Sequence, residues 1–174
     1  MRHAYIGDGK GKSTAALGLL IRAVGAGLRA AAIYFDKGCS TYRHHEVTVL
    51  ERLGVPVHIK GCERMKPDGT FRFGVTPDDR REAREALDLA RRLGQAGEVD
   101  LLVLDEILTC VSGDLVSVED LQGLLRDVPA SVELVCTGRC RDEGWLDGFD
   151  LVSRVTKVRH YFDRGVAARP GIEY

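Results

Sequence analysis

Apolar residues along this chain gather in short runs, and polar segments that contain glycine separate one run from the next. Uninterrupted runs are typical of strands buried on both faces of a parallel sheet, and they occupy 30–35 and 101–104; the largely apolar segment 131–136 predicts another strand of this kind. Shorter runs predict further strands at 3–6 and 55–59, and alternation of apolar and polar residues predicts a last strand at 150–158. Apolar residues at helical spacing predict helices over 13–26, 42–53, 77–93 and 118–125. This alternation of strands and helices predicts an α/β fold, a three-layer domain with a mainly parallel sheet.

Local sequence signals define the first residues of two of these helices, whereas one segment has no predicted secondary structure. Thr76 precedes Pro77 and two acidic residues, which is a helix start with Thr76 as the N-cap. Ser117, with Asp120 three residues later, is the same kind of start for the helix over 118–125. Residues 60–75 carry three glycines and several charges but no period, and loops of this length are usually functional or disordered.

The strongest chemical signal lies where the first strand turns into the first helix. Glycines let the backbone curl so that N–H groups point at one anion, and the helix N-terminus adds partial positive charge. Lys12 supplies a full charge, and the Ser13 hydroxyl is placed to ligate Mg²⁺. Ile6 stands where the first glycine of G-x-x-x-x-G-K-[ST] is expected. The sequence still predicts a phosphate-binding loop (P-loop) that binds ATP through Gly7, Asp8, Gly9, Lys10, Gly11, Lys12, Ser13 and Thr14.

A second acidic element completes the predicted nucleotide site. The apolar run at 101–104 ends in Asp105 and Glu106, so a buried strand delivers two carboxylates to the edge of the sheet beside the P-loop. There they can hold Mg²⁺ directly or through water. Lys37 and Arg139 follow other predicted strands and are further candidates at the same edge. The fold class is therefore a P-loop NTPase-like α/β domain.

Length and composition indicate the number of domains, the classes of partner to expect and the cellular compartment. A length of 174 residues favours one domain over 1–174. Because 25 basic residues balance 26 acidic ones, we expect neither a nucleic acid nor an anionic membrane as a partner. The sequence has no long apolar span and no signal peptide, so we expect a cytoplasmic protein. Five cysteines without a C-x-x-C pair indicate reduced thiols rather than a zinc ribbon.

Several motifs taken together resemble one enzyme family. They are the P-loop with Ala15-Ala16 and Arg22-Ala23-Val24-Gly25, the Leu104-Asp105-Glu106 strand end, Thr137-Gly138-Arg139, and a tail made of Lys157-Val158-Arg159-His160-Tyr161-Phe162-Asp163-Arg164-Gly165-Val166 and Gly171-Ile172-Glu173-Tyr174. In this order they resemble the ATP:corrinoid adenosyltransferases of the bacterial cobalamin pathway. The tail is the most specific part, because ordinary P-loop kinases have nothing like it.

The resemblance implies an unusual use of a P-loop. The cobalt of a reduced Co(I) corrinoid would attack C5′ of ATP, and intact triphosphate would leave. Lys12 and Glu106 carry over as catalytic residues, and Ser13, Glu106 and Asp105 as the surroundings of Mg²⁺, with Asp105 as the orienting partner. Residues 60–75 carry over as the corrinoid-side loop. We also expect a homodimer and a reducing protein partner such as a flavoprotein.

One departure from the family pattern leaves alternatives open. Family members carry a Phe-x-Trp motif that packs on the corrinoid and keeps its lower ligand away, whereas this sequence has Phe71-Arg72-Phe73. Phe71 or Phe73 is expected to take over that packing. The alternatives are a P-loop small-molecule kinase and a nucleotide-dependent corrinoid-binding protein without turnover.

Overall fold

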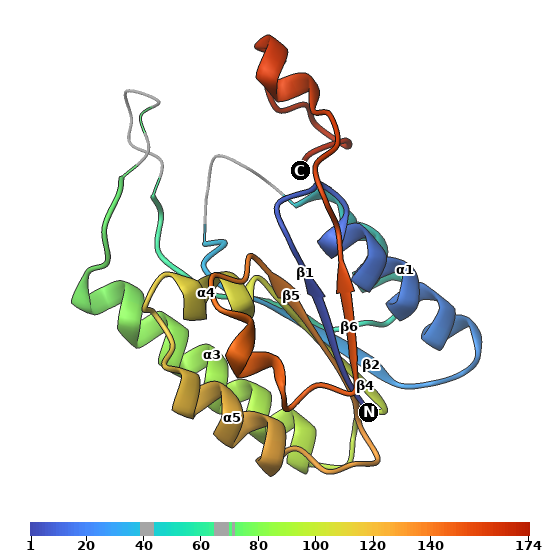
Figure 1. Cartoon of the computed structure of the whole chain (residues 1–174). Helices are drawn as coiled ribbons and strands as arrows, with labels where there is room; N and C mark the ends of the chain where they lie inside the picture. Colours follow the sequence, from blue (N-terminus) through green and yellow to red (C-terminus); the bar gives the residue numbers. More distant parts are fainter. Residues whose placement is uncertain (39–43, 65–69, 71) are drawn as a thin grey trace.

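The computed structural model describes residues 1–38, 44–64, 70 and 72–174. Its centre is one six-stranded sheet in the order β3-β2-β4-β5-β1-β6, with every pair parallel (Figure 1). The strands are β1 Arg2–Ile6, β2 Ala30–Tyr34, β3 Val57–Ile59, β4 Leu101–Asp105, β5 Glu133–Gly138 and β6 Leu151–Arg154. This confirms the α/β class and the parallel sheet expected from the sequence.

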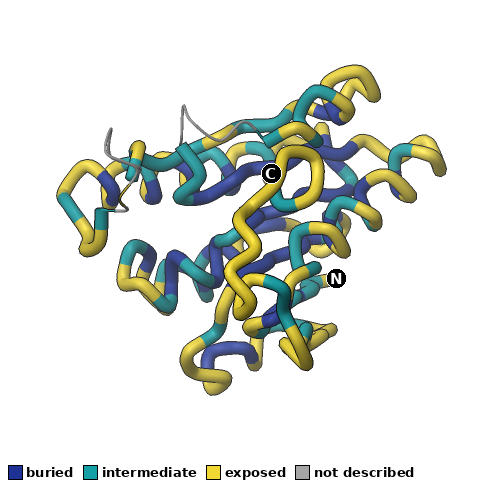
Figure 2. Tube along the Cα trace, turned by 90° about the horizontal axis from the view of Figure 1, so that it is seen from above, coloured by how far each residue is buried: buried dark blue, intermediate teal, exposed yellow. Residues whose placement is uncertain are grey.

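Helices cover both faces of the sheet and make the predicted three layers. The helices α1 Lys12–Gly25 and α2 His45–Arg52 pack on one face. On the other face lie α3 Pro77–Gln95, α4 Ile107–Ser112 and α5 Val118–Asp127 (Figure 1). Alternate residues of β2 feed the two cores, since Ala31 and Ile33 belong to one and Ala32 and Tyr34 to the other. The uninterrupted apolar runs are thus explained by burial on both faces, and the central strands appear in dark blue in Figure 2.

The helix starts predicted from capping signals are confirmed. The Thr76 hydroxyl accepts a hydrogen bond from the Asp79 N–H, and the Asp79 carboxylate accepts one from the Thr76 N–H, at 3.3 and 2.8 Å. Ser117 caps α5 by accepting from the Asp120 N–H at 3.0 Å. The helix expected from residue 42 begins at His45, after His44 in an extended conformation, and residues 42 and 43 lie outside the described residues.

Three details differ from the sequence expectation. The helix α4 was not predicted, because its six residues are too few to show a helical period. The last strand is shorter than 150–158, since the chain leaves the sheet after Arg154. The sheet also places β5 between β4 and β1, so the strand that ends in Asp105 is not the immediate neighbour of the P-loop strand.

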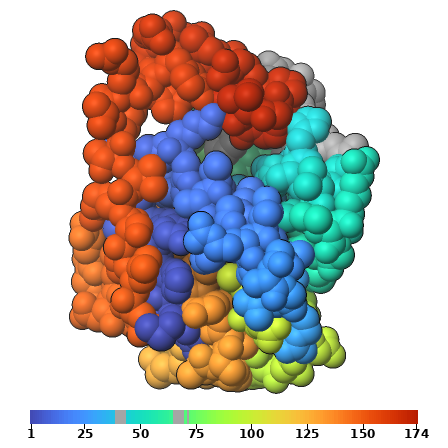
Figure 3. Space-filling view, turned by 90° about the vertical axis from the view of Figure 1, so that its right-hand side faces the viewer, coloured from blue at the N-terminus to red at the C-terminus, as the bar shows by residue number. Residues whose placement is uncertain are grey.

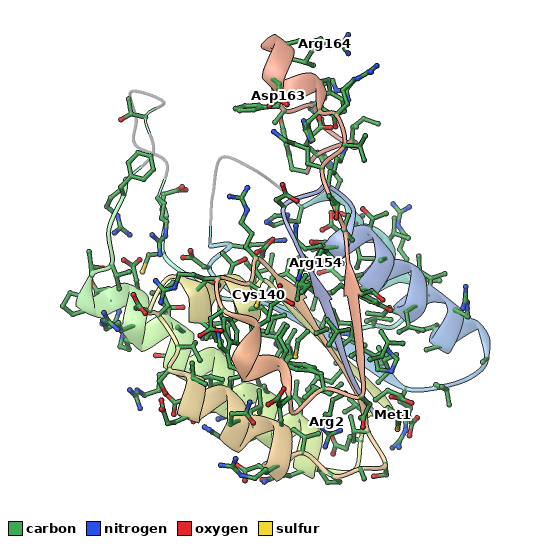
Figure 4. The ribbon with its side chains drawn as sticks, viewed as in Figure 1. Met1, Arg2, Cys140, Arg154, Asp163 and Arg164 are labelled. Atoms are coloured by element: carbon green, nitrogen blue, oxygen red, sulfur yellow. The ribbon has the colours of Figure 1, made fainter. Side chains whose placement is uncertain are left out.

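The C-terminal tail rises beyond the carboxyl edge of the sheet and returns over the P-loop. Seen from above, residues after β6 cross the middle of the molecule (Figure 2). The space-filling view shows the same segment arching over the N-terminal end of α1, with a hollow beneath it (Figure 3). Asp163 and Arg164 lie at the tail end of the molecule, while Met1 and Arg2 lie at the opposite end (Figure 4). The tail therefore belongs to the edge where the predicted site lies.

Candidate active site

The P-loop joins β1 to α1 at the carboxyl edge of the sheet. The helix begins at Lys12, directly after Gly11, whose φ of 126° lies in the left-handed region that favours glycine. The Lys12 Nζ donates a hydrogen bond to the Gly9 carbonyl at 2.9 Å. Burial lowers the pKa of this lysine, while the nearby Glu106 carboxylate acts in the opposite direction. A partly desolvated lysine thus lies beside the first-turn N–H groups of α1, which have no acceptor within the helix.

Two glycines of the P-loop lie in close contact with the main chain after β6, where a side chain would not fit. A Cβ at Gly7 would lie 2.3 Å from the Val155 carbonyl oxygen, and one at Gly9 would lie 2.8 Å from the Thr156 carbonyl carbon. The Gly9 N–H donates to that Val155 oxygen at 2.9 Å. This N–H is therefore directed at the chain itself, so anion binding depends on the later part of the loop.

The two carboxylates at the end of β4 have different surroundings. Asp105 is almost fully buried, and its Oδ1 accepts a hydrogen bond from Thr137 Oγ1 at 2.6 Å. The same carboxylate pairs with the Lys37 ammonium. The nearby Ser13 side chain helps to lower the pKa of this carboxyl group. Glu106 follows with a left-handed φ of 65°, and its carboxylate accepts from the Thr109 hydroxyl. Asp105 is therefore an internal anchor, while Glu106 lies where the strand ends and α4 begins.

Thr137 of the intervening strand β5 connects these groups. Its Oγ1 donates to Asp105 and accepts from the Glu106 N–H at 3.0 Å. The sequence signalled this position only as part of the Thr137-Gly138-Arg139 motif. The structure thus explains why a hydroxyl is useful there, since it orients both acidic residues.

Opposing effects determine the charge state of the buried pair. Burial alone raises the pKa of Asp105, but the Lys37 ammonium, the hydrogen bond from Thr137 and the nearby Ser13 lower it below the ordinary value. Burial lowers the pKa of Lys37, and the Asp105 and Glu106 charges raise it above the ordinary value. Both groups therefore carry charge at neutral pH, as expected for a hydrogen-bonded buried ion pair.

These residues fit a Mg²⁺ ion that is held mainly by a nucleotide. Among the described residues there is no group of three or more His, Cys, Asp and Glu side chains arranged to hold a metal. Both Asp105 oxygens already have protein partners, so this carboxylate fits the role of orienting Ser13. Mg²⁺ usually takes few protein ligands and fills its octahedron with phosphate oxygens and water. Ser13 and Glu106 are the side chains left to contact such an ion.

Lys10, which the sequence assigned to ATP, is bound by the C-terminal tail. Its ammonium donates to Tyr161 Oη at 2.7 Å, to the Ile172 carbonyl at 2.9 Å and to Glu173 Oε1 at 2.7 Å. Arg169 binds the same carboxylate, with its backbone N–H donating to Glu173 Oε2 at 2.7 Å. Arg169, Lys10 and Tyr161 hold the pKa of the Glu173 carboxyl well below its usual range. We call Lys10, Tyr161, Arg169 and Glu173 the tail latch.

The latch has a consequence for the predicted role of Lys10. Because its ammonium is held by the tail, Lys10 can contribute to phosphate binding through its backbone. The sequence could not reveal the latch, since 163 positions separate Lys10 from Glu173.

Two clefts flank the P-loop. The first has a volume of about 550 Å³ and is lined by Ser13, Thr14, Leu17, Lys37, His44, His45, Glu46, Val49 and residues 171–174. The second, of about 530 Å³, is lined by Asp8, Arg139, Lys157, His160, Phe162 and Asp163. The tail forms a wall of both, which accounts for the hollow in Figure 3. The predicted residues 8, 13 and 14 therefore face cavities.

The aromatic loop is only partly described. Phe71 lies outside the described residues, whereas Phe73 is 86% exposed. This exposure leaves the ring of Phe73 accessible to a ligand.

Comparison with known proteins assigns the whole chain to a family. The model of the family described as ATP:corrinoid adenosyltransferase BtuR/CobO/CobP matches residues 1–174. The chain belongs to this family. The corrinoid adenosyltransferase of Escherichia coli strain K12 is 33% identical over 170 residues, which cover 98% of this chain and 83% of that relative. Corrinoid adenosyltransferase CobA of Salmonella typhimurium strain LT2 is 32% identical with the same coverage, and the Pseudomonas aeruginosa corrinoid adenosyltransferase is 28% identical over 171 residues, 98% of this chain and 81% of its own.

Membership of the ATP:corrinoid adenosyltransferase family confirms several expectations from the sequence. These are the resemblance itself, the P-loop NTPase-like fold, the adenosyltransferase class of enzyme, and ATP with a corrinoid as substrates. Within the described residues, no helix is long and apolar enough to cross a membrane. The individual site residues and Mg²⁺ stay predictions, as do the homodimer, the reducing partner and the cytoplasmic location.

Proposed function

We propose that this protein transfers the 5′-deoxyadenosyl group of ATP to the cobalt of a reduced corrinoid and releases triphosphate. The observation that carries the proposal is the tail latch. The tail is the part of the sequence most specific to the adenosyltransferases, and it is bound to Lys10 in the middle of the P-loop. A segment that ordinary P-loop kinases lack would thus form part of the nucleotide site.

The reaction needs no nucleophile from the protein. The Co(I) centre supplies the electron pair that forms the cobalt–carbon bond, and it becomes formally Co(III). The bond between C5′ and its oxygen breaks, and its electron pair leaves with triphosphate. Negative charge therefore accumulates on the leaving group, which is where cationic and N–H groups are most effective.

The P-loop residues supply that stabilisation. Lys12 lies beside the first turn of α1, and its ammonium and the helix N–H groups would bind the phosphates. Ser13 and Glu106 would hold a Mg²⁺ ion that neutralises phosphate charge, with Asp105 orienting Ser13. The loop from Gly7 to Thr14, which includes Asp8, would enclose the phosphates. Gly7 and Gly9, which pack closely against the chain after β6, would fix the shape of the loop.

We assign corrinoid binding to the loop over 60–75 for two reasons: the resemblance to the adenosyltransferase family and the aromatic residues of the loop. Phe73 is exposed, and Phe71 or Phe73 would pack on the lower face of the ring in place of the absent tryptophan. A homodimer in the cytoplasm, supplied with Co(I) by a flavoprotein or similar reductant, completes the proposal. Nothing in the geometry favours a kinase or a binding protein without turnover.

The test is a spectroscopic time course with chemically reduced corrinoid, Mg²⁺ and ATP. The Co(I) absorbance should disappear only when protein and ATP are both present, and a light-sensitive adenosylated corrinoid should form. Samples without corrinoid should consume no ATP. ATP consumption that is independent of corrinoid would support a kinase, and corrinoid binding without loss of Co(I) would support a carrier.

A further inference from the structure

Two consecutive residues after β2 join the nucleotide edge to the loop over 60–75. Asp36 has a φ of 50°, a left-handed value that residues other than glycine adopt rarely. Its carboxylate accepts a hydrogen bond from Arg64, while the next residue, Lys37, pairs with Asp105. The turn at Asp36 thus directs two consecutive side chains to different partners: Asp36 to Arg64 of the loop, and Lys37 to Asp105 at the end of β4.

On the nucleotide side, the contact reaches the P-loop. The Lys37 side chain is 19% exposed and that of Asp105 is 3% exposed, so their ion pair is largely shielded from water. Ser13 lies near Asp105, close enough to lower the pKa of that carboxyl group. A change in charge at Ser13, such as the arrival of phosphates, is therefore transmitted to Lys37 through one carboxylate.

On the loop side, charged residues hold both ends of the loop. Arg64 Nε donates to Asp36 Oδ1 at 2.8 Å, and the Arg64 carbonyl accepts from the Arg72 N–H at 2.7 Å. The Arg72 guanidinium makes a bidentate pair with Asp79 at 2.9 and 2.7 Å, and the Asp79 side chain is completely buried. We call Asp36, Arg64, Arg72 and Asp79 the loop-base cluster.

The main chains of the two segments also touch. The Lys37 N–H donates to the Lys60 carbonyl at 2.9 Å. A Cβ at Gly38 would lie 1.8 Å from the Gly61 carbonyl oxygen, and one at Gly61 would lie 2.6 Å from the Asp36 Cα. Because no side chain separates these backbones, a displacement at Asp36 or Lys37 must displace the start of the loop as well.

We propose that Asp36 is a positioning residue that couples nucleotide binding to the placement of the corrinoid-side loop. ATP at Ser13 and Asp105 changes the charge around Lys37, and Asp36 passes the response to Arg64 and to the base of the loop. The assignment of the loop to the corrinoid rests on the proposed function, whereas the coupling itself rests on the contacts. Asp36 touches neither ATP nor the reacting atoms, and it acts through Arg64.

The test variant is Asp36→Asn, because asparagine keeps the size and also tolerates a left-handed φ, so mainly the charge is lost. The matched control is Glu85→Gln, which removes the exposed ion pair between Glu85 and Lys60 at the start of the same loop. Amide hydrogen exchange of residues 60–64 and 72–75 is followed with and without Mg²⁺ and ATP, and ATP affinity is measured by calorimetry. These readouts require no corrinoid.

The expected result is that ATP slows exchange of both segments in the wild type and in Glu85→Gln, but not in Asp36→Asn. The ATP dissociation constant should stay within about twofold in both variants, whereas KM for the corrinoid should rise about tenfold in Asp36→Asn, the effect of losing a hydrogen bond to a charged group. Arg64→Gln should give the same phenotype, and the double variant should be no worse. If Asp36→Asn does not fold, Arg72→Lys tests the other half of the cluster.

Two results would overturn the coupling: no effect of ATP on loop exchange in the wild type, or equal protection in Asp36→Asn. A merely structural ion pair would lower thermal stability without changing either ATP protection or KM for the corrinoid. The two proposals can also fail separately. If ATP slows amide exchange of the loop in the wild type but not in Asp36→Asn, and the wild type accepts no corrinoid, the coupling is supported and the proposed function is rejected.

Discussion

Replacement of Gly7 by alanine tests whether the close backbone packing of the P-loop sets ATP affinity. Gly7 has a φ of 114°, at which a residue with a side chain is strained by roughly 1–3 kcal/mol. The new Cβ would also lie 2.3 Å from the Val155 carbonyl oxygen, so the loop or the chain after β6 must move. A strain of about 2 kcal/mol that ATP binding must overcome corresponds to about 30-fold weaker affinity, because about 1.4 kcal/mol is tenfold.

The assay is calorimetric titration with ATP and Mg²⁺, together with thermal unfolding. Gly18→Ala is the matched control, because Gly18 lies within α1 and an added Cβ there meets nothing within 4 Å. That control should bind ATP normally and gain about 0.5–1 kcal/mol of stability. A Gly7→Ala protein whose ATP affinity stays within about twofold of the wild type would refute the reasoning.

Three further substitutions test assigned roles. Lys12→Ala should abolish ATP binding or turnover and leave the unfolding temperature nearly unchanged, and near-normal turnover would reject the P-loop assignment. Glu106→Gln should raise the Mg²⁺ concentration needed for half-maximal turnover about tenfold through loss of one carboxylate; an unchanged metal titration would transfer that role to Ser13 and water. Phe71→Ala, Phe73→Ala and the double variant should keep ATP affinity and reduce the four-coordinate corrinoid seen by spectroscopy, whereas an unaltered fraction in all three would reject the aromatic assignment.

The elements that the sequence predicted well are those with local signals. Thr76 and Ser117 carry their capping partners three residues away, so the starts of α3 and α5 follow from short-range chemistry. The run at 101–104 is apolar throughout because both faces of β4 are buried. The helix α4 was missed because its six residues are too few to show a helical period.

The features that the sequence could not predict depend on residues far apart in the chain. The order of strands brings Thr137 of β5 between the P-loop and Asp105, and no local pattern encodes that order. Lys37 reads as a turn lysine, but the strand order pairs it with Asp105, which lies 68 positions away. The tail lacks a core pattern because its contacts are polar and converge on Lys10.

Product analysis tests the central claim most directly, because it identifies the bond of ATP that breaks. The protein would be incubated with Mg²⁺, ATP and chemically reduced corrinoid, and phosphorus NMR would be compared with the yield of adenosylated corrinoid. We predict triphosphate and a light-sensitive cobalt–carbon product in equal amounts. Release of ADP with a phosphorylated small molecule, or ATP consumption that corrinoid does not affect, would contradict adenosyl transfer.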